Sequence, residues 1–204
     1  MSAERVLPSD DGGGVVERSP DTDPTDEALV VAAADGDARA FQELIGRHES
    51  RVLRVLRLMG VAAQDREDVA QDVFIRIFRH LSGFHRGRPF QAWVYRIAVN
   101  SAHDYRTRQG RSALESGWEE SAEPVSTASG PESEAELRDL RLQLTGAMAE
   151  LTDRERAVFI LREVEGLTTI EVARALGIAR VTVRRHLNLA RKRLRVALGG
   201  NDEP

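Results

Sequence analysis

The sequence contains no cysteine, a single lysine, few aromatic residues and no long apolar run. Without cysteine the chain can form neither disulfides nor thiolate metal sites, and this composition is consistent with a cytosolic protein. No stretch reaches the roughly 18 apolar residues of a membrane-spanning helix, so we predict no membrane insertion. Residues 1–26 lack the apolar segment of a secretory signal. Because aromatic residues make up only 5% of the chain, its cores must be built from Leu, Val, Ile and Ala, which favours helices.

The positive charge is almost entirely arginine, and it is concentrated in two blocks. The 204 residues carry a net charge of −4, which by itself argues against a polyanionic partner. Residues 51–114 nevertheless carry +7 and residues 151–198 carry +6, whereas residues 1–50 and 115–150 carry −8 and −7. DNA responds to a basic face and not to the total charge. Since arginine presents a planar fork of donors that suits phosphate and guanine, both blocks predict nucleic-acid contacts.

The spacing of apolar residues predicts an all-α protein, with two small helical domains joined by a flexible linker. The two domains are separated by a segment that loses periodicity and gains Ser, Glu, Gly and Pro. The predicted division is a disordered acidic tail over 1–25, a first domain over 26–110, the linker over 111–131, a second domain over 132–198 and a short tail over 199–204.

Within the first domain, a helix is expected from Asp26, and others over about residues 38–59, 65–81 and 90–109. The apolar side chains of the 65–81 helix that we expect to point inward are Val69, Val73, Phe74, Ile77, Phe78 and Leu81. The second domain is expected to begin with a helix over 132–150. Thr152 followed three residues later by Glu155 then predicts a capping box at the start of the next helix.

Residues 168–194 have the pattern of a helix-turn-helix. Thr168 or Thr169 can cap a short first helix, in which the small Ala173 allows a close helix crossing. Gly177 supplies the left-handed turn conformation that a side chain would disfavour. The second helix is expected to place Val183 and Leu187 against the first.

The second helix of this motif also presents polar side chains between its apolar positions. Arginine can pair with guanine and asparagine with adenine in the major groove, and further basic residues can bind phosphates. The alternative is a helical hairpin with a solvated arginine face, since cations also suit a helix C-terminus. We favour DNA binding, through Arg180, Thr182, Arg184, Arg185, His186, Asn188, Arg191 and Lys192.

Two surfaces of the first domain also point to function. Trp93, Tyr95 and Phe90 are interleaved with arginines. This pattern suits a single strand of nucleic acid, whose unstacked bases can stack on the aromatic rings. Trp93 and Tyr95 could equally fill the core.

The 65–81 helix has a polar edge formed by Glu67, Asp68, Gln71 and Asp72. This edge is compatible with protein docking, with a metal or catalytic site, or with a solvated face. No histidine interleaves with it and no pocket pattern accompanies it.

Three stretches, residues 65–74, 84–106 and 151–195, together resemble regions 2 and 4 of the extracytoplasmic-function (group IV) sigma factors of bacterial RNA polymerase, without a region 3 domain. The resemblance implies a promoter-recognition subunit in the cytoplasm that is not an enzyme and takes no cofactor, metal or small-molecule substrate. The implied partners are the clamp and flap of core RNA polymerase, promoter DNA and an anti-sigma factor, within a stress or envelope-signal regulon.

The resemblance also assigns roles to individual residues. The polar edge of Glu67, Asp68, Gln71 and Asp72 is implied to dock on the clamp. Contacts to the −10 element, including a pocket for a flipped base, are implied for Phe84, Arg86, Arg88, Phe90, Trp93, Arg96, Asn100 and Arg106. Contacts to the −35 element are implied for the helix-turn-helix residues named above. We expect Asp104 to be structural.

The chain departs from the family pattern in its second basic helix. Val181 occupies a position where the family often has a small residue, and Arg185 with His186 replace a common Ser-Arg pair. The −35 specificity therefore does not carry over.

A further hypothesis is that the acidic tail and linker fold against the basic faces and suppress DNA binding. Two alternatives remain: a stand-alone dimeric transcription factor, which does not need the 65–109 block, and an enzyme built on the acidic edge.

Overall fold

The computed structural model describes residues 24–85, 87–116 and 143–199, which form helices and connecting turns and contain no strand. The all-α prediction is thereby confirmed. Most of the predicted tail and linker, and residues 132–142 of the helix expected over 132–150, lie outside the described residues.

The first helical unit consists of α1 (Asp26–Ala34), α2 (Ala38–Leu58), α3 (Arg66–His80), the 3-10 turn η1 (Leu81–Gly83) and α4 (Phe90–Ser116). Thr25 caps α1 and Asp37 caps α2, each through a side-chain oxygen that accepts from backbone N–H groups of the first turn. α3 packs against both α2 and α4, and α1 packs on α2. Leu44, Val52, Leu56, Val73 and Tyr95 are among the buried side chains at the centre.

α4 continues to Ser116, seven residues past its predicted end at about residue 109. The prediction was wrong because it relied on the loss of apolar periodicity. Residues 108–116 contain no proline, and most are good helix formers (Arg, Gln, Ala, Leu and Glu) that do not need a buried face. The boundary drawn at residue 110 therefore falls inside a continuous helix.

The prediction that Phe78 points inward was also wrong, since its side chain is 60% exposed. Val73, Ile77 and Leu81, spaced four residues apart, form the centre of the buried stripe on this segment. Phe78 lies at the rim of that stripe and contacts the ring of Phe41 edge-on, at 5.0 Å between centroids. The predicted apolar arc was wider than the face that the neighbouring helices cover.

The second unit consists of a helix over residues 143–149, α6 (Asp153–Phe159), a π-helical turn η2 (Ile160–Val164), α7 (Thr169–Leu176) and α8 (Arg180–Ala197). The capping box predicted at Thr152 and Glu155 is present. α8 packs along α6 and α7, so the three helices share one small core.

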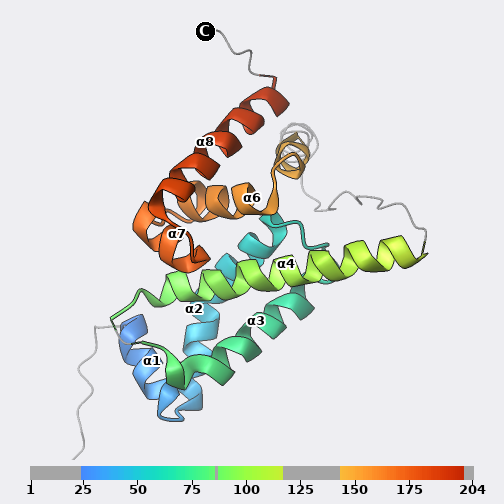
Figure 1. The fold of residues 1–204 in the computed structure, drawn as a ribbon. Helices are drawn as coiled ribbons and strands as arrows, with labels where there is room; N and C mark the ends of the chain where they lie inside the picture. The colour runs from blue at the N-terminus through green and yellow to red at the C-terminus, as the bar shows by residue number, and fades with distance from the viewer. Residues whose placement is uncertain (1–23, 86, 117–142, 200–204) are drawn as a thin grey trace, which may run out of the picture.

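The second unit lies against the first along α4 (Figure 1). Figure 1 shows α6, α7 and α8 on one side of this long helix and α3 with α1 on the other. α7 packs directly on α4, and the buried apolar residues of both units form one continuous cluster. α4 therefore serves both units as a packing surface.

Candidate nucleic-acid interface

α7 and α8 form the helix-turn-helix that the sequence predicts. Thr168 caps α7, with its Oγ1 accepting from the Glu171 N–H while the Glu171 carboxylate accepts from the Thr168 N–H at 2.7 Å. These hydrogen bonds from Thr168 hold the pKa of Glu171 below its ordinary value. Gly177 then takes the left-handed conformation, at φ 64°. Both local predictions for this motif are confirmed.

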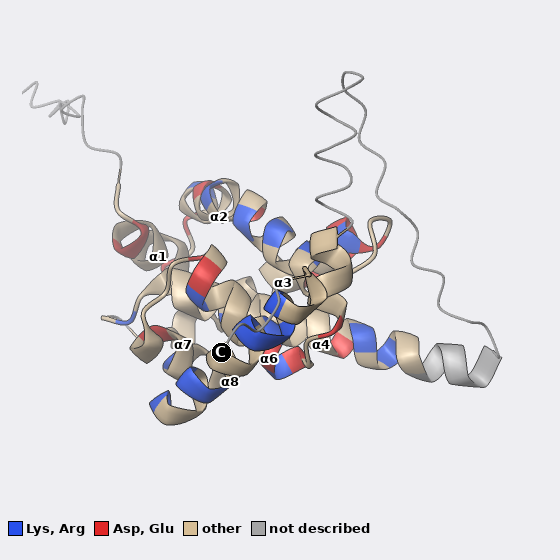
Figure 2. Ribbon diagram, turned by 90° about the horizontal axis from the view of Figure 1, so that it is seen from above, with Lys and Arg blue, Asp and Glu red and all other residues tan. Residues whose placement is uncertain are grey.

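The interior of the motif also agrees with the prediction. Val172, Ala173 and Leu176 of α7 are buried, as are Val183 and Leu187 of α8. This packing fixes which side of α8 faces outward. Figure 2 shows the basic residues spaced along the helix.

The outward side of α8 carries the side chains predicted to bind DNA. Arg180, Arg184, Arg185, Asn188 and Lys192 are exposed. Arg191 is also exposed and pairs with Glu163 at 2.8 Å. The two half-buried members of the predicted set are Thr182 and His186. All eight side chains thus lie on or beside one accessible surface, with the first turns of α8 open to solvent.

An aromatic cluster stands at the start of α4. The ring of Phe84 lies 5.6 Å from Phe90 and 5.0 Å from Trp93, centroid to centroid, and Phe90 lies 5.7 Å from Trp93. Phe90 is only 3% exposed and rests on His48, whose Nε2 is 2.7 Å from an Asp26 carboxylate oxygen. Phe84 and Trp93 are half-buried and form the outer layer of the cluster.

The burial of these rings separates core from surface. Phe90 supports the cluster from below, and Tyr95 is fully buried. Arg88, Arg96 and Asn100 are exposed nearby in sequence, and Trp93, Arg96 and Asn100 share one face of α4 by their spacing. Arg86 lies outside the described residues.

Arg106, the remaining residue predicted to contact the −10 element, faces the second unit instead. Its guanidinium pairs with the carboxylate of Asp153. The other oxygen of this carboxylate, Oδ2, lies 2.9 Å from Nδ1 of the His103 ring. Asp153 is the first residue of α6. The structure therefore does not bring Arg106 together with Trp93 and Asn100.

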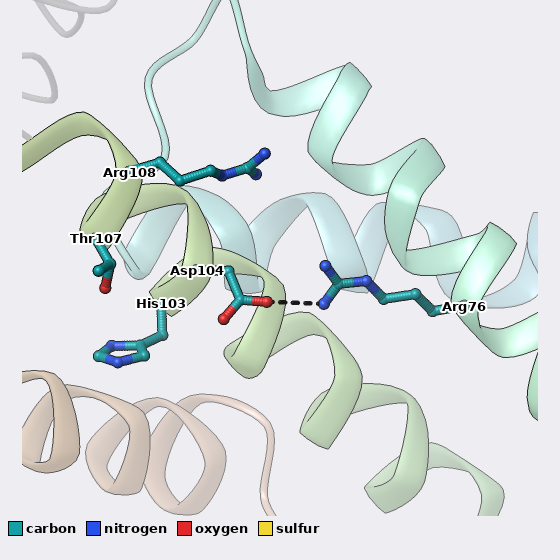
Figure 3. Close-up of a pocket in the computed structure, with 5 residues that line it drawn as sticks. All are labelled: Arg76, His103, Asp104, Thr107 and Arg108. Atoms are coloured by element: carbon teal, nitrogen blue, oxygen red, sulfur yellow. Dashed lines mark hydrogen bonds and ion pairs between the residues drawn. The ribbon is translucent and has the colours of Figure 1, made fainter. Parts of the chain in front are cut away.

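A groove of about 450 Å³ lies beside this contact. Its lining residues are Arg76, His103, Asp104, Thr107 and Arg108, shown in Figure 3. Arg76 of α3 reaches across to Asp104 of α4, with 3.0 Å between Nη1 and Oδ2. Asp104 thus links α3 to α4, as a structural residue would.

Sequence reasoning missed a second polar contact between the units. Glu165, whose side chain is almost fully buried, accepts two hydrogen bonds from Arg54 of α2, at 2.8 and 3.0 Å. Glu165 also accepts from the hydroxyl of Tyr95 on α4. Burial, together with this hydrogen bond, raises the pKa of Tyr95 to about 12.

A buried arginine makes the third contact. Arg156 is 4% exposed and donates to the carbonyl oxygens of Met148 and Ala149, the last two residues of the 143–149 helix, and of Leu151 just beyond it. It also donates to the carbonyl oxygen of Met59, at the end of α2 in the other unit. Burial, together with the nearby positive charge of Arg106, lowers the pKa of Arg156. The residue after Met59 is a glycine with positive φ, where a Cβ would lie 3.2 Å from the same guanidinium.

The polar edge of α3 lies on the outer surface of the first unit. Glu67, Asp68, Gln71 and Asp72 are all exposed, and none of the four forms an ion pair within the described residues. Two exposed apolar side chains extend the same face, Ile75 at 40% and Phe78 at 60%. The edge is therefore an accessible acidic surface with an apolar end.

Several known proteins resemble this chain. The Sigma-70 region 2 family matches residues 44–112 and the Sigma-70 region 4 family matches residues 141–194. The RNA polymerase sigma factor NccH of Alcaligenes xylosoxydans xylosoxydans is 34% identical over 180 residues, which cover 87% of this chain and 97% of NccH. The ECF RNA polymerase sigma-E factor of Escherichia coli K12 is 33% identical over 175 residues, covering 82% of this chain and 91% of that protein. Among solved structures, CnrH in complex with the cytosolic domain of CnrY matches with a TM-score of 0.66 and 28% identity, over 87% of this chain and 99% of CnrH.

A helix-turn-helix with a basic outer face, joined to a helical unit with an arginine-bearing aromatic surface, defines a DNA-binding transcription protein. The chain belongs to the extracytoplasmic-function family of RNA polymerase sigma factors. Members of this family are transcription initiation factors, which sets aside the enzyme alternative and the stand-alone regulator. Within the described residues, no helix is long and apolar enough to cross a membrane.

Proposed function

We propose that this chain binds core RNA polymerase in the cytoplasm and directs it to promoters by contacting their −10 and −35 elements. In this proposal residues 26–110 bind the polymerase and open the −10 element, while residues 132–198 read the −35 element. Each unit alone binds weakly, and joining them in one chain raises the effective concentration of the second contact.

The proposed polymerase contact is the acidic edge of α3. Its four polar residues are solvent-exposed, and Asp68 and Asp72 lie one helical turn apart on the same side. The exposed Phe78 at the end of this face adds an apolar contact, which a partner surface would bury. A solvated acidic face without a partner does not account for a large exposed aromatic side chain beside it.

The proposed −10 contact is the outer layer of the aromatic cluster. Phe84 and Trp93 present partly exposed rings, and the buried Phe90 holds them in place. A base that leaves the duplex loses a few kcal/mol of stacking and pairing, which stacking on such rings offsets. Arg88 and Arg96 are placed to bind the backbone of the separated strand.

The observation that carries the −35 assignment is the division of α8 into two faces. Its apolar residues are buried against α6 and α7, which leaves the arginines and Asn188 of the first turns outside. A recognition helix in the major groove requires this arrangement.

The contacts between the units bear on how the protein is held inactive. Arg106 is engaged by Asp153, so the arrangement described here withholds it from DNA. We propose that the two units separate when polymerase binds, and that an anti-sigma partner stabilises the closed form. CnrH, the structural neighbour, was solved in complex with the cytosolic domain of another protein, CnrY.

In vitro transcription from a genomic fragment library tests this function, with core polymerase in the presence and absence of the protein. Defined start sites that appear only with the protein, and that share −35 and −10 sequences, are the expected result. If the protein neither binds core polymerase nor produces start sites, the proposal is wrong.

A further inference from the structure

The first turn of α8 carries an apolar side chain in the middle of its basic face. Val181 is 71% exposed, the highest value among the large apolar side chains in the described part of the chain. It is the second residue of the helix, between Arg180 and Thr182.

The spacing of residues along α8 shows that Val181 points away from the core. The buried residues Val183, Leu187, Ala190 and Leu194 follow one another at steps of four, three and four. Val181, Arg185, Asn188 and Lys192 follow at the same steps, displaced by two residues, and all four are exposed. Because a displacement of two residues is about 200° around a helix, the second set lies opposite the first.

The surroundings of Val181 indicate what it contacts. The exposed side chains that follow Val181 along the outer face are Arg184, Arg185 and Asn188. The next large apolar side chain that α8 exposes, Leu189, lies eight residues further on, so Val181 is not part of a contiguous apolar patch on this helix. A protein-docking site would need a contiguous apolar patch. A major groove offers an apolar group of matching size, the C5-methyl of thymine, amid the acceptors and donors that arginine and asparagine recognise.

We propose that Val181 contacts the methyl group of a thymine in the −35 element, and that this contact makes the chain select thymine at that position. The inference rests on the proposed function, because it requires α8 to occupy the major groove. Recognition helices of this motif read bases with their N-terminal residues, where Val181 lies.

Replacement of thymine by deoxyuridine tests the contact directly, because it removes the methyl group and leaves base pairing unchanged. The probe is a promoter duplex recovered from the start-site mapping above, with each −35 thymine on either strand replaced singly. Binding is measured with holoenzyme assembled from core polymerase and the full chain. One replacement should weaken binding by wild-type holoenzyme about three- to fivefold, the effect of one buried methyl-sized group.

The Val181→Ala variant should bind the thymine promoter about three- to fivefold more weakly than wild type, and should lose nothing further at the sensitive position. Val196→Ala is the matched control, since Val196 is 60% exposed at the far end of the same helix, and it should behave as wild type. Alanine at position 181 also preserves the helix.

The inference is overturned if no thymine replacement weakens wild-type binding, or if Val181→Ala shows the same loss as wild type at the sensitive position. It is also overturned if Val181→Ala loses affinity for core polymerase, which would make Val181 a protein contact. Failure of the proposed function is a separate result, because wild-type holoenzyme would then give no defined start sites.

Discussion

Replacing Arg156 with methionine should destabilise both helical units at once. Methionine fills a similar volume but donates no hydrogen bond, so the carbonyl oxygens of Met148, Ala149, Leu151 and Met59 would each lose the bond from Arg156, and Met148 would keep only the one from the Leu151 N–H. Since one of these oxygens belongs to α2 and three to the second unit, the variant removes a tie between the units as well as the cap of a helix.

The expected loss follows from the geometry of these bonds. A hydrogen bond from a charged donor contributes about 1.5–3 kcal/mol net. Only the bond to Met148 has a standard length, 3.0 Å, whereas the other three span 3.3–3.4 Å and are weaker. Removing the arginine also removes the several kcal/mol that burying its charge costs. The balance is a decrease of about 2–4 kcal/mol in the free energy of unfolding.

Urea denaturation followed by far-UV circular dichroism measures this loss. Arg154→Met is the control, because Arg154 is exposed and makes a single 3.5 Å contact with the Leu176 carbonyl oxygen. The control should change the free energy of unfolding by less than about 0.5 kcal/mol. If Arg156→Met unfolds at the same urea concentration as wild type, the buried arginine does not stabilise the fold as reasoned here.

Three other predictions follow from the interface and the helix-turn-helix. Glu165→Ala removes the acceptor shared by Arg54 and Tyr95, so the two units should be separated in a larger share of the molecules. Energy transfer between dyes on cysteines introduced in α1 and at the end of α8 measures the distance between the units. An unchanged distance distribution would contradict the prediction. The raised pKa of Tyr95 stabilises the folded protein below pH 10, and this contribution should be lost as pH rises from about 10 to 12, by about 2–3 kcal/mol. The chain has no cysteine and one lysine, but burial also raises the pKa of Tyr105, the second tyrosine. In urea titrations at each pH, Tyr95→Phe should therefore show a smaller decline than wild type, and Tyr95→Phe with Tyr105→Phe a smaller one still. Thr168→Ala should cost about 1 kcal/mol of unfolding free energy, and a loss below about 0.3 kcal/mol would argue against its capping role.

The features that the sequence predicted well are those that depend on near neighbours. The capping box at Thr152 and the cap expected at Thr168 or Thr169 each lie within four consecutive residues, and the turn at Gly177 needs only a residue that tolerates positive φ. The helix-turn-helix core likewise follows from a 3.6-residue period. Such patterns are complete within a short window of sequence, so no tertiary information is required.

The contacts between the units depend on residues far apart in sequence. Arg54 and Glu165 are 111 positions apart, and both are of a type expected on the surface. Neither charge pattern nor periodicity distinguishes a solvated glutamate from one that accepts from two partners in another unit. The same limit applies to Phe78, whose exposure is set by how far the neighbouring helices reach.

Comparing two double variants in holoenzyme assembly and promoter-directed transcription tests the central claim most directly. The claim is that polymerase docking and −35 reading reside on separate surfaces. Asp68→Arg with Asp72→Arg should weaken core polymerase binding at least tenfold by reversing two charges on the α3 edge. Arg184→Ala with Arg185→Ala should leave core binding unchanged and abolish transcription that depends on the −35 element. If the α3 variant binds core polymerase as wild type does, or the α8 variant still requires the −35 sequence, the division of roles between the units is wrong.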